Sequence, residues 1–115
     1  MPDPTNLLLR LDAVTPITPE HPTQEDLIPW RDRIDVIDRL MINLLNERAN
    51  CAVAIGHIKR KVGLPVYVPA REEDVLNNVS SANPGPLSNQ AVRRLYERII
   101  DETRSLERQL SENDV

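Results

Sequence analysis

Apolar residues recur between residues 30 and 62 at alternating steps of four and three, which is typical of a long helix with one packed face. The members of this apolar seam are Trp30, Ile34, Ile37, Met41, Leu44, Cys51, Ile55, Ile58 and Val62. Arg48 occupies a seam position where an aliphatic residue is expected. A guanidinium keeps its charge, so burying it is costly unless a carboxylate or an anionic ligand meets it. Arg48 is therefore a candidate site residue.

Two further apolar stripes are interrupted in the same way. The stripe around Glu72 consists of Val75, Leu76 and Val79, and the stripe around Thr103 consists of Leu95, Ile99, Leu106 and Leu110. Apolar stripes of neighbouring helices face one another in a folded domain. The three interruptions therefore predict a polar site inside a helical bundle.

Local start and stop signals delimit three helices. Pro29 suits the first turn of a helix, Gly63 suits the position after a helix end, and Ser88 is a good N-cap. The expected helices span about residues 29–62, 69–82 and 88–110. The fold class is therefore all-α: a three-helix chain with a long first helix, forming one helical domain over residues 28–115.

Residues 1–27 have a different character. They contain five prolines, which forbid a long helix, together with scattered acidic residues. We interpret this segment as a flexible or loosely docked N-terminal extension. Its short apolar patch, residues 7–9, can pack on the domain or make no contact with it.

The length of the first helix bears on the oligomeric state. About 33 residues at a rise of 1.5 Å give a helix of roughly 50 Å. A compact domain of about 90 residues has a diameter of only about 30 Å. The end of the seam that extends past such a domain needs a second chain, and the simplest arrangement is a homodimer of intertwined long helices.

Composition excludes several functional classes. The chain has a net charge of −4 and contains one Trp, two Tyr and no Phe, so it is poorly suited to binding phosphate backbones or stacking on bases. No stretch approaches the roughly 20 apolar residues of a membrane span. Neither nucleic acid nor a membrane is an expected partner.

The cysteine and histidine content indicates which cellular compartment and which cofactors to expect. A single cysteine excludes an intrachain disulfide and favours a reducing compartment, and the N-terminus lacks a secretory signal pattern. A cytoplasmic location is expected. Cys51 lies on the apolar seam and is interpreted as a small core residue. His21 and His57 are isolated and form no metal site, so no metal or cofactor is expected.

Three cations of the first helix are candidates for holding an anionic ligand. Arg48 and Lys59 differ by only about 20° in azimuth and lie about 16 Å apart along a helix, so their long side chains can hold a small dianion between them. Arg31 lies about 26 Å from Arg48 by the same rise. It is too far to serve that site in its own chain, but in an antiparallel dimer it can reach the site of the partner.

Segments spread over residues 28–110 resemble the all-helical chorismate mutases. They occur in the order and with the spacing of that family, at residues 30–38, 44–48, 56–59, 66–72, 85–88 and 99–107. The resemblance implies an intertwined dimer of three-helix chains, in agreement with the length argument. It also implies a Claisen rearrangement of chorismate to prephenate in phenylalanine and tyrosine biosynthesis.

The resemblance assigns four residues to the substrate carboxylates. Arg48 and Arg31 of the partner subunit are expected to bind the two carboxylates, Arg71 to support their charge, and Thr103 to assist one of them. Arg side chains suit this task because their planar donors match a carboxylate.

The remaining assigned residues face the ether oxygen and the ring hydroxyl. Lys59 is expected to bind a carboxylate and to donate to the ether oxygen, which Glu107 also faces, while Glu72 holds the hydroxyl. Such a rearrangement needs no cofactor. It needs a folded substrate arm and positive charge where the breaking C–O bond becomes anionic.

Three positions differ from the pattern of this family. Val68 stands where an Asp often binds the hydroxyl, so only its backbone N–H can serve there. Thr103 replaces a common Ser and keeps the hydroxyl group. Glu107 stands where well-known members have Gln. Only a protonated Glu107 can donate to the ether oxygen, so burial must raise its pKa although Lys59 lowers it.

Other interpretations stay open at this level. Each candidate residue can be a surface charge, a helix-end charge, a satisfied hydroxyl or half of a salt bridge. The salt-bridge alternatives are Arg48 with Glu47 or Asp101, Glu107 with Arg104 or Arg108, and Arg31 with Asp35. The functional alternatives are an isochorismate pyruvate lyase of the same fold and a non-enzymatic helical regulatory or interaction module.

Overall fold

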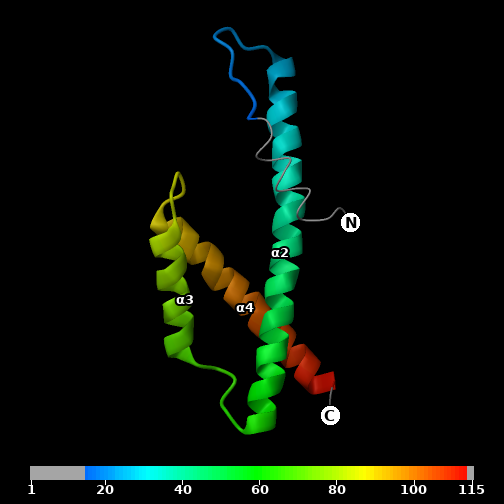
Figure 1. Cartoon of the computed structure of the whole chain (residues 1–115), viewed down its shortest axis with the longest axis vertical. Helices are drawn as coiled ribbons and strands as arrows, with labels where there is room; N and C mark the ends of the chain where they lie inside the picture. Colours follow the sequence, from blue (N-terminus) through cyan, green and yellow to red (C-terminus); the bar gives the residue numbers. More distant parts are fainter. Residues whose placement is uncertain (1–14, 114–115) are drawn as a thin grey trace. The chain divides into compact units, whose positions relative to one another are not determined.

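A computed structural model describes residues 15–113 of the chain. Its elements are the short 3-10 helix η1 (Gln24–Asp26) and the α-helices α2 (Leu27–Val62), α3 (Pro69–Ala82) and α4 (Asn89–Asn113) (Figure 1). Residues 15–113 contain no strand, which confirms the all-α prediction. The predicted apolar patch at residues 7–9 lies outside the described residues.

Helix α2 begins two residues earlier than its sequence signals suggested. The backbone N–H of Thr23 donates to Oδ2 of Asp26 at 2.7 Å, and this local turn forms η1 directly before Leu27. Pro29 is thus the third residue of α2. Its missing N–H costs nothing there, because the first N–H groups of a helix have no intrahelical partner.

The end of α2 and the start of α3 follow their local signals. Gly63 has a φ of 76°, and the N–H of Leu64 donates to the carbonyl of Lys59 at 2.8 Å, closing the last turn of α2. Val68 is extended, and its carbonyl accepts the N–H groups of Arg71 and Glu72 at 3.0 and 3.3 Å. The connector between the helices is therefore fixed at both ends by backbone hydrogen bonds.

A tight turn joins α3 to α4. The side chain of Asn83 donates to the carbonyl of Leu87 at 2.7 Å and accepts the N–H of Gly85 at 3.1 Å. Ser88 Oγ accepts the N–H of Ala91 at 3.1 Å, which confirms Ser88 as the N-cap of α4. This turn brings α4 back along α3 (Figure 1).

The described residues form two compact units, residues 15–48 and residues 49–113. In the first, Val36 and Leu40 are buried, with exposed fractions of 5% and 7%. In the second, helices α3 and α4 pack against each other and Leu76 is buried on α3. Burial within one chain is thus limited to a few aliphatic side chains of the described residues.

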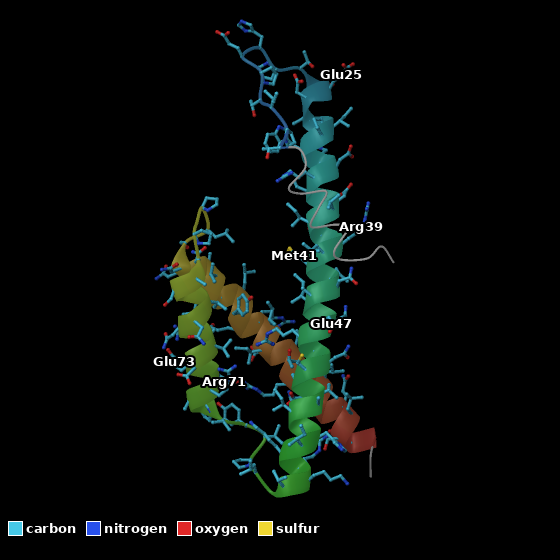
Figure 2. All side chains as sticks on the ribbon, viewed as in Figure 1. Glu25, Arg39, Met41, Glu47, Arg71 and Glu73 are labelled. Atoms are coloured by element: carbon cyan, nitrogen blue, oxygen red, sulfur yellow. The ribbon has the colours of Figure 1, made fainter. Side chains whose placement is uncertain are left out.

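Most of the apolar seam of α2 remains exposed in the single chain. The seam residues with exposed fractions above one third are Trp30, Ile34, Met41, Leu44, Ile55, Ile58 and Val62. Figure 2 shows Met41 and Arg39 on different sides of α2. Cys51 is also exposed, so its interpretation as a core residue of this chain is wrong. The reason is that an apolar seam does not by itself show whether its own chain covers it.

Candidate active site

Glu107 of α4 lies among cations of the second unit. It is half-buried, and burial raises the pKa of its carboxyl group, while Arg60, Lys59 and Arg104 each act to lower it. Gly56 of α2 lies next to this side chain, because a Cβ built on Gly56 would be 3.8 Å from the Glu107 Cδ atom. Burial and nearby positive charge therefore have opposite effects on the pKa of Glu107, as predicted, and the net result is a raised pKa.

Lys59 is held in place by the connector between α2 and α3. Its ammonium group donates to the carbonyl of Val66 at 3.3 Å, and its side chain is half-buried. An ammonium has three donors, so two remain for a ligand. Lys59 is thus a tethered cation beside Glu107.

Glu72 pairs with an arginine that sequence reasoning treated only as an alternative partner of Glu107. The Arg104 guanidinium donates to Oε1 of Glu72 and lies over the ring of Tyr67, with Cζ 4.8 Å from the ring centroid. Arg104 is three residues before Glu107, so the two side chains share a face of α4. In the sequence, this three-residue spacing from Glu107 was the feature that could have placed Arg104 at the candidate site.

Thr103 is satisfied by its own helix. Its hydroxyl donates to the carbonyl of Ile99 at 2.8 Å, and the side chain is half-buried. A hydroxyl rotates freely, so it can exchange this partner for a ligand oxygen. The geometry is compatible with both the structural and the binding interpretation.

The side chains of three predicted arginines make no hydrogen bond or ion pair with the described residues. Arg31 and Arg71 are exposed, and Arg48 is half-buried. The alternative salt bridges of Arg48 and Arg31 do not form within residues 15–113. In Figure 2, Arg71 and Glu73 project from different sides of α3. These cations remain available to anionic partners.

The second unit therefore brings together Lys59, Glu72, Thr103 and Glu107 with Arg104. Val68 is half-buried at the start of α3, where its carbonyl is already used by the helix. Within residues 15–113, no group of three or more His, Cys, Asp or Glu side chains is placed to hold a metal ion. In the same part of the chain, no helix is at once long enough and apolar enough to cross a bilayer.

Comparisons with known proteins agree on one family. Residues 30–108 match the family described as chorismate mutase type II. A bifunctional chorismate mutase/prephenate dehydratase of Neisseria gonorrhoeae is 44% identical over 87 residues, which are 76% of this chain and 24% of that protein. The chorismate mutase of Methanocaldococcus jannaschii is 25% identical over 89 residues, 76% of this chain and 90% of that protein.

A solved structure shows the same helical fold. The chorismate mutase of Thermus thermophilus in its form II has a TM-score of 0.69 and 33% identity, over 71% of this chain and 93% of that one. The present chain spans about a quarter of the length of the bifunctional relatives. Its helical fold and its match over residues 30–108 lead to one conclusion: this chain belongs to the type II chorismate mutase family.

Proposed function

We propose that this protein is a chorismate mutase, an isomerase that converts chorismate to prephenate in phenylalanine and tyrosine biosynthesis. The observation that carries the proposal is the placement of Lys59 beside a half-buried Glu107 whose pKa is raised. The family to which the chain belongs supports the same conclusion. A donor pair of this kind suits a reaction in which negative charge develops on an ether oxygen.

Lys59 and Glu107 are the proposed catalytic pair. The ammonium of Lys59, tethered to Val66, donates to the ether oxygen of the substrate and to a carboxylate. Protonated Glu107 donates to the same ether oxygen. Together they stabilise the charge that grows as the C–O bond breaks, and no proton is consumed.

Arginines and Thr103 form the proposed carboxylate clamp. Arg48 is half-buried and its side chain lacks a partner among the described residues, so its guanidinium is available to an anion. Arg71 adds positive charge, and Thr103 turns its hydroxyl from Ile99 to the ligand. Arg31 of the partner subunit completes the clamp. Holding both carboxylates folds the flexible substrate arm over the ring.

The ring hydroxyl is proposed to bind at the start of α3. Glu72 accepts the hydroxyl proton in a hydrogen bond, and the backbone N–H of Val68 contributes a donor. Val68 has no side-chain oxygen, so hydroxyl recognition depends mainly on Glu72.

The proposed assembly is a homodimer in which two α2 helices bury the apolar seam. Large aliphatic side chains such as Met41 and Ile58 are 52% and 57% exposed in the single chain. Exposed apolar surface that is continuous along a helix marks an interaction surface. The occupant is a second copy, because the site needs Arg31 of the partner subunit.

A single cysteine also favours the reducing environment of the cytoplasm.

The direct test compares chorismate consumption by the wild type, Arg48→Ala and Arg39→Ala. Arg39 is the matched control, since a nine-residue separation places it about half a turn around α2 from Arg48. We expect prephenate from the wild type and a loss of roughly 10- to 100-fold in kcat/KM for Arg48→Ala. Arg39→Ala should retain wild-type activity.

Two results would contradict this function. Salicylate formed from isochorismate, with chorismate unchanged, would identify a pyruvate lyase. Absence of turnover of either substrate by a folded wild-type protein would identify a non-enzymatic helical module.

A further inference from the structure

Arg104 connects three parts of the second unit. Its guanidinium donates to Oε1 of Glu72 on α3, lies 4.8 Å from the centroid of the Tyr67 ring in the connector, and approaches Oδ1 of Asp101 at 3.9 Å. The Arg104 and Glu72 side chains are 40% and 24% exposed, so the pair is partly screened from solvent. The hydrogen bond to Glu72 is the largest of the influences that raise the pKa of Arg104.

We propose that Arg104 is a positioning residue that orients the Glu72 carboxylate toward the ring hydroxyl of the substrate. This inference rests on the proposed function, because it specifies how the hydroxyl subsite is built. Arg104 itself does not touch the substrate.

The carboxylate geometry supports this role. A carboxylate has two oxygens and about four lone-pair positions, so Arg104 at Oε1 leaves Oε2 able to accept a hydroxyl. An unpaired Glu side chain samples many rotamers, and fixing it on binding costs conformational entropy. The ion pair fixes Glu72 before the substrate arrives, which lowers that cost.

Tyr67 fixes the orientation of Arg104 in turn. A guanidinium that lies over an aromatic ring is attracted by the ring face, and its planar donors then point in fixed directions. Lysine has a compact ammonium that cannot reproduce this stacking. We therefore expect Arg104→Lys to keep the charge but to orient Glu72 poorly.

The chain contains a matched control pair. Nη2 of Arg93 on α4 donates to both carboxylate oxygens of Glu73 on α3, at 2.6 and 2.8 Å. This pair joins the same two helices as Arg104 and Glu72, but neither residue belongs to the proposed site. Breaking it reports the effect of losing an interhelical ion pair without disturbing the hydroxyl subsite.

The experiment is a double-mutant cycle on the full chain. It measures kcat and KM for chorismate in the wild type, Arg104→Met, Glu72→Ala and the double variant, with Arg104→Lys and Arg93→Met alongside. Circular dichroism first establishes a temperature at which every variant is folded, so that kinetics and stability are separated.

We expect Arg104→Met to raise KM by about tenfold while kcat changes less than about twofold. The reason is that the contact to the ring hydroxyl is equally strong in the bound substrate and in the transition state. In the Glu72→Ala background, the same substitution should raise KM by less than about twofold, since its partner is gone. Arg104→Lys should raise KM by an intermediate factor, and Arg93→Met should leave KM unchanged.

Different failures have different meanings. An active wild type in which Arg104→Met leaves KM unchanged, or raises it equally with and without Glu72, overturns the positioning role and leaves the proposed function intact. A KM increase in Arg93→Met equal to that in Arg104→Met also overturns it. A folded wild type without mutase activity overturns the proposed function itself, and the inference with it.

Discussion

At the scale of single residues, Glu107 is the group whose protonation the proposed mechanism needs. Its carboxyl must be protonated to donate to an ether oxygen, and burial raises its pKa against the opposing effects of Arg60, Lys59 and Arg104. A raised pKa keeps the acid form populated to a higher pH than an ordinary glutamate allows. The residue is thus better suited to its proposed role than a glutamate with an ordinary pKa.

The first prediction concerns the pH dependence of activity. The acid form of Glu107 is lost as pH rises through its raised pKa, so kcat should fall as pH rises, and the fall should come at a higher pH than an ordinary glutamate would give. Glu107→Gln donates at any pH, so its profile should be flatter. Initial rates at saturating chorismate check this. A flat wild-type profile, or an unchanged slope in Glu107→Gln, would exclude this role.

Arg48 and Arg71 illustrate a second residue-scale feature, which is positive charge without a carboxylate partner. Surface arginines commonly lack fixed partners, so Arg71 alone carries little weight. Arg48 is half-buried and interrupts an apolar seam, and its lack of a partner among the described residues is therefore more informative. The comparison of Arg48→Ala with Arg39→Ala tests whether a half-buried arginine on the seam matters more for activity than an exposed arginine on α2.

At the scale of elements, α2 contains a glycine that its own geometry does not require. Gly56 is buried within the helix, and a Cβ there would meet Nη1 of Arg60 at 3.5 Å and Cδ of Glu107 at 3.8 Å. Both are ordinary contact distances. Gly63, in contrast, has a φ of 76°, which disfavours any residue with a side chain.

Two substitutions at these glycines should therefore have opposite effects. Gly56→Ala should stabilise the fold by about 0.5–1 kcal/mol, because alanine loses less backbone entropy in a helix than glycine. Gly63→Ala should destabilise it by about 1 kcal/mol, because alanine is strained in the left-handed region. Thermal unfolding measures both. A loss of stability in Gly56→Ala would mean that another surface approaches α2 closely at this position.

At the scale of the whole molecule, most of the apolar seam of α2 is exposed in the single chain, which supports the proposed homodimer. Burial of apolar surface is the main favourable contribution to association. A seam that contains Trp30, Met41 and Ile58 supplies such surface over much of the helix. In the proposed homodimer, activity depends on association, because each site is proposed to include Arg31 of the partner subunit.

Introducing a charge into the seam should separate the two chains. Met41→Glu places a carboxylate in the proposed interface, where desolvation opposes dimer formation. We expect sedimentation to show a monomer and mutase activity to be lost. Arg39→Glu, on a different side of α2 (Figure 2), should remain dimeric and active. A wild-type protein that sediments as a monomer at the assay concentration would refute the shared site.

The sequence by itself determined the three helices and most of their ends, since those ends depend on neighbours within a few residues. The start of α2 at Leu27 and the end of α4 at Asn113 lie outside the expected bounds. Gly63 closes α2, Pro69 begins α3, and the Ser88 hydroxyl caps α4 through an N–H only three residues away. The resemblance also identified the family. These predictions succeeded because propensities and caps are local properties of the chain.

Only the tertiary structure decided which side chains pair. Glu72 and Arg104 are 32 residues apart, and their ion pair exists because α3 and α4 pack together with both side chains on the facing surface. The exposure of Cys51 was decided in the same way, since an apolar seam does not reveal which chain will cover it. Ion-pair partners and burial depend on packing between distant segments, and a local sequence pattern does not encode the choice of partner.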